Sequence, residues 1–330
     1  MSFPKSSIPE NCDYLMTSRT IKEYLLISLR GIGMGAADVV PGVSGGTIAF
    51  ITGIYEELIN SIKSINLEAI RLFFSGRWKS FWRHINGNFL LAVFSGILIS
   101  IFSLAKLLEY LLEHQPVLIW SFFFGLIVAS SYVVSRKIKN WDYPKVVALV
   151  GGIGIAFYIT SVTPATTTDA LWFIVLSGAL ASCAMILPGI SGSFILLLLG
   201  KYAFVLHAVN QTILVDLGLV AVGVVIGLIS FANLLSWLLK RFHDVTIAVL
   251  VGFMIGSLNK IWPWKETLET IVVDGEVKPL VEKNILPALD NPDHLILLAI
   301  AMAIVGILVI LAIELILPKK QLEEKAPFGS

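Results

Sequence analysis

Two apolar stretches of this chain are interrupted near their centres by the same kind of residue cluster, and this limits the possible folds more than any other feature. The first cluster reads PGVSGG at residues 41–46, and the second reads PGISGS at residues 188–193. A proline followed by glycines ends a helix. Each stretch, at residues 24–62 and 170–209, is therefore predicted to be two helical pieces joined by a break.

The two breaks belong to an internal repeat. Residues of the first stretch recur 147 positions later, and a second spacing of 127 positions holds further along the chain. The pairs at the first spacing include Pro41 with Pro188, Gly53 with Gly200, and Tyr55 with Tyr202, and a pair at the second spacing is Gly96 with Gly223. The first half therefore carries extra residues, which lie in the basic linker at 71–84. A repeat of this length indicates two related structural units.

The composition places these units in a membrane. Hydrophobic residues make up 56% of the chain and charged residues only 14%, whereas soluble domains carry about 25% charged residues. We predict an all-α integral membrane protein with six full transmembrane helices and two opposed, re-entrant hairpins. The predicted spans are 89–112, 117–135, 146–162, 213–239, 245–261 and 295–317.

The predicted organisation is an inverted repeat. Each half contains one hairpin and three spans, an odd number of crossings, so the second half must enter from the opposite side. The expected parts are a tail at 1–23, repeat 1 at 24–165, repeat 2 at 166–318 with an outer loop at 262–293, and a tail at 319–330. With both termini in the cytoplasm, 17 lysines and arginines fall inside and 5 outside, which satisfies the positive-inside rule.

Several classes of function are disfavoured by residues the chain lacks. The cysteines, Cys12 and Cys183, form no CxxC motif, and no Walker loop, HExxH motif or nucleophile elbow is present. We expect no metal, no cofactor and no nucleic-acid partner.

The breaks are the candidate binding site. Backbone amides freed at membrane depth must face protein or a polar cavity, and a helix start attracts anions. Ser44 and Thr47 are suitable helix caps. Two such starts meeting from opposite sides would accept a phosphate or carboxylate, although the glycines could instead serve close packing with no ligand. The candidate substrate-binding residues at the breaks are Ser44, Gly45, Gly46, Thr47, Ser191, Gly192 and Ser193, and the turn residues are Pro41, Gly42, Pro188 and Gly189.

Two charged residues lie near the first break. A charge at bilayer depth costs about 2.5–3.5 kcal/mol, so each is expected to have a function or a partner that offsets this cost. Arg30 and Asp38 correspond to Ser177 and Met185 in the second half. Arg30 either binds an anionic head group, pairs with Asp38 or reaches the cytoplasmic face. Asp38 either takes part in ion coupling or pairs with Arg30. The candidate coupling or gating residues are Asp38, Tyr55, Glu56 and Tyr202.

These motifs resemble one family. Residues 35–47 (GAADVVPGVSGGT), then 53–56, 187–193 and 200–202, resemble the bacterial polyprenyl-phosphate (undecaprenyl-phosphate) transporters. The resemblance implies a flippase of the bacterial plasma membrane. It would return the lipid carrier undecaprenyl phosphate from the outer to the inner leaflet for peptidoglycan and other envelope synthesis. Our hypothesis for such a substrate is that the phosphate binds at 44–47 and 191–193 with Arg30 supplying charge, and that transport is coupled to protons or sodium, with Asp38 as the proton-coupling candidate.

Two rival functions remain open. The motif is more weakly similar to integral polyprenyl-diphosphate phosphatases, which carry a Pro-Gly-x-Ser-Arg-Ser segment. Gly45 stands in the place of that arginine, and phosphoryl transfer needs a cation on the transferring group, so we expect no enzyme activity. A secondary transporter of a small anion would use broken helices equally well.

Overall fold

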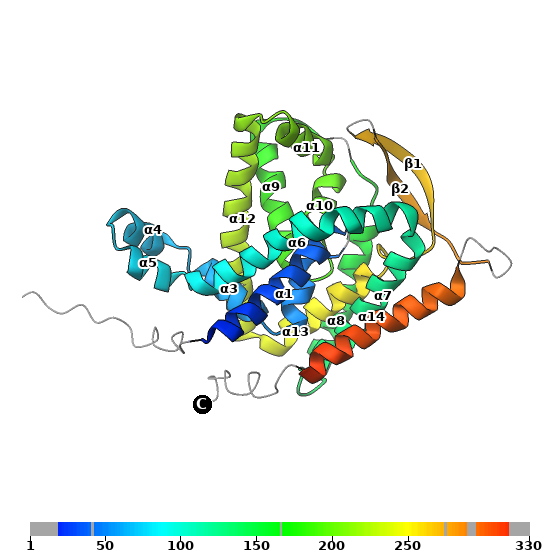
Figure 1. The fold of residues 1–330 in the computed structure, drawn as a ribbon, viewed down its shortest axis with the longest axis horizontal. Helices are drawn as coiled ribbons and strands as arrows, with labels where there is room; N and C mark the ends of the chain where they lie inside the picture. Colours follow the sequence, from blue (N-terminus) through cyan, green and yellow to red (C-terminus); the bar gives the residue numbers. More distant parts are fainter. Residues whose placement is uncertain (1–18, 41–42, 166, 274–275, 289–294, 317–330) are drawn as a thin grey trace, which may run out of the picture.

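The computed structural model describes residues 19–316 apart from 41–42, 166, 274–275 and 289–294, and in that part the chain is mostly helical (Figure 1). The helices before residue 165 are α1 (Ile21–Val39), α2 (Gly45–Ile51), α3 (Tyr55–Lys63), α4 (Leu67–Phe74), α5 (Trp78–His84), α6 (Gly87–His114), α7 (Pro116–Ser135) and α8 (Tyr143–Ser161). The later helices are α9 (Leu171–Ile186), α10 (Gly192–Leu198), α11 (Tyr202–Asn210), α12 (Leu214–Arg241), α13 (His243–Ser257) and α14 (Ile296–Ile316).

Five of the described helices are long and apolar enough to cross a membrane: α6, α7, α8, α12 and α14. The sequence predicted six. The missing one is α13, which has 15 residues and is therefore about 22 Å long, less than the thickness of a bilayer core. The bent pair α10–α11 passes the same test when its two helices are taken together. The chain is a multi-pass membrane protein.

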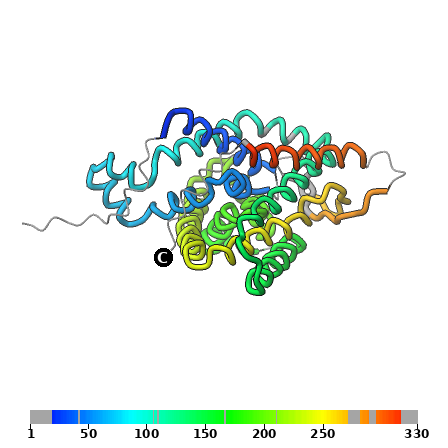
Figure 2. Tube along the Cα trace, turned by 90° about the horizontal axis from the view of Figure 1, so that it is seen from below, coloured from blue at the N-terminus to red at the C-terminus, as the bar shows by residue number. Residues whose placement is uncertain are grey.

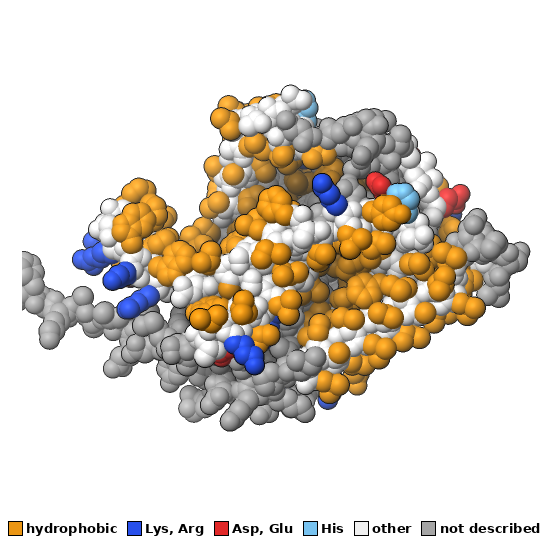
Figure 3. Space-filling model, in the orientation of Figure 1, with side chains coloured by type: hydrophobic (Ala, Val, Ile, Leu, Met, Phe, Trp, Pro, Cys, Tyr) orange, Lys and Arg blue, Asp and Glu red, His pale blue; other side chains and the backbone are white. Residues whose placement is uncertain are grey.

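The surface agrees with this assignment. Large apolar side chains are widely exposed, for example Phe102 at 83% and Leu297 at 84%. Figure 3 shows hydrophobic side chains over most of the visible face. A soluble protein rarely exposes so large an apolar area, so this surface is suited to contact with lipid tails.

The long helices lie side by side in four pairs: α1 with α6, α9 with α12, α7 with α14, and α8 with α13. In the first two pairs the backbones touch at glycines. A Cβ atom on Gly96 would lie 2.0 Å from the Ser28 carbonyl oxygen, and one on Gly223 would lie 2.0 Å from the Val175 carbonyl oxygen. These residues match at the two spacings of the repeat, so the repeated sequence makes the same helix contact twice.

Each interrupted stretch consists of three helices, not two. The returning arm bends a second time, between α2 and α3 and between α10 and α11. The bends fall at Gly53 (φ 76°) and Gly200 (φ 64°), a backbone conformation that favours glycine. The Ile54 and Lys201 amides bond back to the carbonyls five residues earlier, which is a common way to end a helix. The α10–α11 bend measures 115°.

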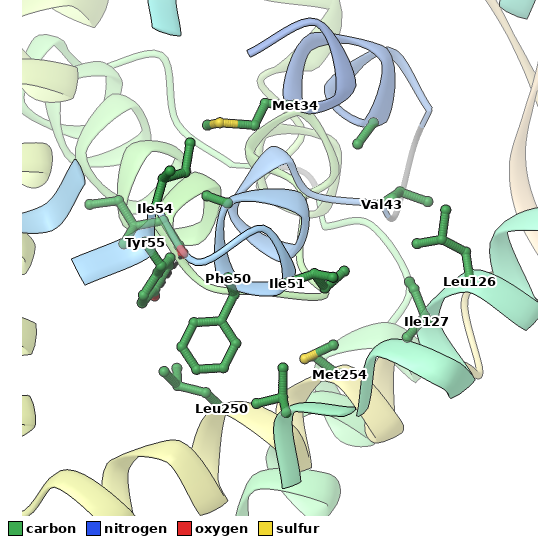
Figure 4. Close-up of a cluster of buried hydrophobic side chains, with 14 of the residues drawn as sticks. Met34, Val43, Phe50, Ile51, Ile54, Tyr55, Leu126, Ile127, Leu250 and Met254 are labelled. Carbon is green, nitrogen blue, oxygen red and sulfur yellow. Dashed lines mark hydrogen bonds between the residues drawn. The ribbon is translucent and has the colours of Figure 1, made fainter. Parts of the chain in front are cut away.

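The main hydrophobic core surrounds α2 (Figure 4). Phe50 makes an edge contact with Tyr55 at 4.7 Å between ring centroids, and it packs beside Leu250 and Met254 of α13. Ile127 of α7 belongs to the same buried cluster. This packing buries the short helix that follows the first break inside the protein.

The prediction of an all-α chain is wrong between residues 262 and 293. Strand β1 (Lys265–Val273) pairs with antiparallel strand β2 (Glu276–Asn284), and the register shifts near Glu269. Strand β1 contains five β-branched residues and β2 contains two, and such residues favour a pleated sheet. The Nζ atom of Lys265 lies 4.0 Å from the Trp120 ring centroid and 3.4 Å from Glu282. These contacts hold the strands against the start of α7.

Candidate functional site

The first break comprises residues 40–44, between α1 and α2. Ser44 is the N-cap of α2, as predicted, and its Oγ accepts a hydrogen bond from the Gly46 amide at 3.1 Å. The Gly45 amide donates to Oδ1 of Asp38 at 2.7 Å. Two backbone amides at the start of α2 are therefore already bonded to side chains of the same interrupted stretch. Pro41 and Gly42 lie outside the described residues.

The second break comprises residues 187–191, between α9 and α10. Pro188 and Gly189 form its turn, with Gly189 at φ 93°. Ser191 precedes α10 but caps no amide with its side chain. Instead, the Oγ atoms of Ser191 and Ser193 lie 2.6 Å apart. The partners of the α10 start therefore differ from those of the α2 start.

The structure brings the two breaks into contact. The Ser44 hydroxyl donates to the Met185 carbonyl oxygen at 3.1 Å. The Gly189 amide donates to Oγ1 of Thr47 at 3.0 Å. Polar groups from parts of the chain more than 140 residues apart are thus bonded directly to each other.

Two further residues tighten this junction. The Tyr55 hydroxyl donates to the Ile186 carbonyl oxygen at 3.0 Å. Gly46 lies so close to the end of α9 that an added Cβ atom would approach the same carbonyl oxygen to 2.6 Å. A glycine is needed here for close approach of two backbones. Gly192 is also packed closely, with an added Cβ atom 2.7 Å from the Ala181 carbonyl oxygen.

The junction is closed in this conformation. Ser44 and Thr47 have no exposed surface, and Ser191 is 4% exposed. Their polar groups are bonded to each other or to nearby backbone, as buried polar groups must be. An anion could reach these residues only by replacing protein contacts.

Three predicted site residues lie outside the junction. Arg30 is half-buried on α1, eight residues before Asp38 and hence about 12 Å away along the helix. Within the described part of the chain, no ion pair joins Arg30 to Asp38. Glu56 is exposed on the first turn of α3, with Oε1 at 3.4 Å from Nε2 of His243. Tyr202 is half-buried at the start of α11.

Sequence reasoning missed several partners. The carbonyl groups of Met185 and Ile186 carry no residue-type signal, so no motif could identify them. Glu57 offered a weak signal, as a charge next to Glu56. It forms a two-pronged ion pair with Arg19, with both N–O distances at 2.7 Å. This pair ties the segment before α1 to α3.

A multi-pass membrane protein in which two interrupted helices meet through buried polar groups is typical of secondary transporters. The comparisons with known proteins agree with this class. Residues 34–278 match the undecaprenyl phosphate translocase-like family. The chain belongs to that family.

Two curated relatives are similar over most of their length. A polyprenyl-phosphate transporter of Vibrio cholerae serotype O1 is 47% identical over 304 residues, covering 91% of this chain and 98% of the relative. A polyprenyl-phosphate transporter of Staphylococcus aureus is 35% identical over 261 residues, covering 71% of this chain and 85% of the relative. No solved structure matches. The prediction of a transporter, not an enzyme, agrees with the family and with both names.

Proposed function

We propose that this chain carries a polyprenyl phosphate, with undecaprenyl phosphate as the first candidate, from the outer to the inner leaflet of the bacterial plasma membrane. The lipid carrier would thereby be recycled for envelope synthesis. The names of the two relatives support the substrate class. The direct bonds between the two breaks support the mechanism, because they place polar groups inside an otherwise apolar protein.

The architecture that suits this function is an inverted repeat, with halves at 24–165 and 166–318 and both termini in the cytoplasm. The helix pairs support it. In the repeat, α1 corresponds to α9, α6 to α12, α7 to α13 and α8 to α14. The contact between α1 and α6 therefore has its counterpart in the contact between α9 and α12, and the contact between α7 and α14 has its counterpart in the contact between α13 and α8. A pseudo-twofold arrangement of this kind lets one set of helices rock against another about a shared site. The distribution of lysine and arginine supports the orientation.

In this proposal the phosphate binds where the two breaks meet. The hydroxyl groups of Ser44, Thr47, Ser191 and Ser193 and the amides around Gly45, Gly46 and Gly192 are the candidate donors. In the described conformation the Ser44 and Thr47 hydroxyls and the Gly45 and Gly46 amides have protein partners, and the Ser191 and Ser193 hydroxyls bond to each other, so it corresponds to a closed state of the transporter. Opening would separate the Thr47–Gly189 and Tyr55–Ile186 bonds, which gives Tyr55 a gating role.

Two charged residues would act beside the junction. Arg30 would attract the phosphate from its half-buried position on α1. Asp38 would be displaced from the Gly45 amide when the phosphate arrives, because both anions compete for the same donor. The released carboxylate could then take up a proton or a sodium ion and couple transport to an ion gradient. Glu56, beside His243, and Tyr202 are the remaining candidates for gating.

Leaflet-resolved movement of a labelled polyprenyl phosphate in proteoliposomes tests the proposal. We expect movement well above protein-free liposomes, a loss of at least tenfold in Arg30→Gln, and near-normal movement in Lys22→Gln, which removes an exposed charge from the same helix. Lipid movement no faster than in protein-free liposomes, together with uptake of inorganic phosphate, would favour the small-anion transporter. Release of phosphate from a polyprenyl diphosphate would favour the enzyme.

A further inference from the structure

Residues 64–86 form a small unit that projects from the rest of the molecule. It contains α4 and α5, and we call it the basic hairpin. Both views show it at one end of the molecule, away from the other helices (Figures 1 and 2). Within the described chain, α4 packs mainly on α5, and α5 contacts α6. The second half has only residues 211–213 at the equivalent place, between α11 and α12. The basic hairpin is therefore an addition to the repeat.

The basic hairpin has an apolar face that the protein does not cover. Leu67 is 85% exposed, Phe74 is 82% exposed and Trp78 is 57% exposed. Phe73 holds this face together through edge contacts with Phe74 and Trp78. Exposure of so many large side chains on two short helices indicates a surface made to be covered.

The same unit is strongly basic. Arg71, Arg77, Lys79 and Arg83 are exposed, and Glu68 is the only acidic residue between positions 64 and 86. Within the described residues, none of the four bases forms an ion pair with a carboxylate. Figure 3 shows basic and hydrophobic side chains together on this projecting unit. Uncompensated cations beside aromatic residues match an anionic, partly apolar surface.

The basic hairpin is also held in a defined position. Oδ1 of Asn66 caps α4 by accepting from the Glu68 and Ala69 amides. Nε1 of Trp82 donates to Oδ1 of Asn88 on α6 at 2.7 Å. The Trp82–Asn88 bond joins the unit to the start of α6, a membrane-spanning helix. Its apolar face therefore has a fixed direction relative to that helix.

Length decides how the unit meets the membrane. Helix α4 has eight residues and is about 12 Å long, which is too short to cross a bilayer core. We propose that the basic hairpin lies in the membrane interface, with its aromatic face among the upper acyl chains and its four bases bound to the head groups of anionic phospholipids. This inference does not depend on which substrate the protein carries.

A nitroxide label on the apolar face tests the proposal in the full-length protein. The label is placed at Phe74→Cys, or in a second preparation at Ile70→Cys, in a Cys12→Ser/Cys183→Ala background. The protein is reconstituted into nanodiscs of phosphatidylcholine with or without phosphatidylglycerol. Collision of the label with oxygen and with a water-soluble nickel chelate measures its depth. We expect the oxygen preference to rise when phosphatidylglycerol is present and to fall again at high salt, because salt screens exposed charges.

Charge variants separate lipid binding from other causes. Arg71, Arg77, Lys79 and Arg83 are replaced together by glutamine. The rise in oxygen preference caused by phosphatidylglycerol should then fall by about tenfold or more, since each base near an anionic membrane surface contributes substantially to binding. The matched control replaces four exposed bases elsewhere, Lys22, Lys139, Lys240 and Arg241, and should leave the label unchanged. Labels at both positions that remain open to the nickel chelate in every lipid would overturn the proposal. A label shielded from both reagents would mean that protein covers the face, and this would also overturn it.

Discussion

The two interrupted helices share their turn sequence but differ in what holds the break together. At the first break, the carboxylate of Asp38 accepts from the Gly45 amide at 2.7 Å. At the second break the equivalent position is Met185, a residue that is 46% exposed. The first break is therefore held by a charged side chain of the same interrupted stretch, whereas the second break is held by its contact with the first. Sequence similarity between two repeats does not imply the same local chemistry.

Each of the two interrupted stretches, α1–α3 and α9–α11, has an ion pair that holds its returning arm, and these ion pairs also differ. In the first half, Arg19 and Glu57 are both largely buried, with side chains 18% and 19% exposed. In the second half, Lys201 is 3% exposed, but its partner Asp169 is 73% exposed. Each pair ties the segment before a hairpin to its returning arm, and the charges are reversed. The same mechanical connection is thus made by a shielded pair in one half and by a half-open pair in the other.

The largest expected effect comes from making the first break resemble the second. Position 46 is glycine in the first half, and the equivalent position in the second half is Ser193. Gly46→Ser should lower the free energy of unfolding by about 1–3 kcal/mol or more, because its Cβ would press on the Ile186 carbonyl. Ser193→Gly should cost only about 1 kcal/mol, from added backbone freedom. Thermal unfolding in detergent checks both. Equal effects would mean that the breaks are equivalent.

The bond between the breaks gives the next largest effect. Thr47→Val keeps the side-chain shape but leaves the buried Gly189 amide without its partner, which should cost about 1–3 kcal/mol. Thr47→Ser retains the hydroxyl and should cost less. Chemical denaturation of the purified protein measures the difference. A stability of Thr47→Val equal to that of Thr47→Ser would show that this hydrogen bond does not hold the breaks together.

The role of Asp38 predicts a smaller effect and a contrast with Met185. Asp38→Ala removes a helix-capping partner and should destabilise the protein by about 1 kcal/mol. Asp38→Asn retains an acceptor oxygen and should be milder. Met185→Ala removes a half-exposed side chain and should change stability least. The order of the three melting temperatures checks this prediction, and a Met185→Ala variant less stable than Asp38→Ala would reverse the comparison.

The ion pairs should differ by the least. A double-mutant cycle with Arg19→Gln and Glu57→Gln should give a coupling energy of about 1–2 kcal/mol, as expected for a shielded two-pronged pair. The cycle with Lys201→Met and Asp169→Asn should give less than about 1 kcal/mol, since solvent screens an exposed carboxylate. Cycles measured by denaturant unfolding make the comparison directly. A larger coupling for the second pair would contradict it.

Several features of the fold and site could be predicted from the chain alone. The turn clusters marked both breaks, because proline and glycine have strong backbone preferences that need no partner. Ser44 was recognised as a helix cap for the same local reason. The second bends at Gly53 and Gly200 were missed, although both glycines were noted as repeat residues. Their role depends on a positive φ angle, which a glycine permits but does not require.

The partners of the candidate site could not be predicted. The carbonyl groups of Met185 and Ile186 are backbone atoms, and any residue could supply them. The sequence leaves a pair between Asp38 and Arg30 open, but the carboxylate bonds to the Gly45 amide instead. The short α13 and the β1–β2 pair were also not foreseen, because apolar periodicity does not report where a helix ends or whether a loop forms strands.

The sequence by itself determined that the chain is a membrane protein with a repeated, interrupted helical stretch, because composition and turn residues act locally. Only the tertiary structure decided which groups meet at the breaks, since those contacts join side-chain hydroxyls to backbone groups 131 to 142 residues away. It also decided that the basic hairpin is left uncovered by the rest of the protein. Residue types determine local backbone preferences, whereas contacts between distant segments depend on how all the helices pack together.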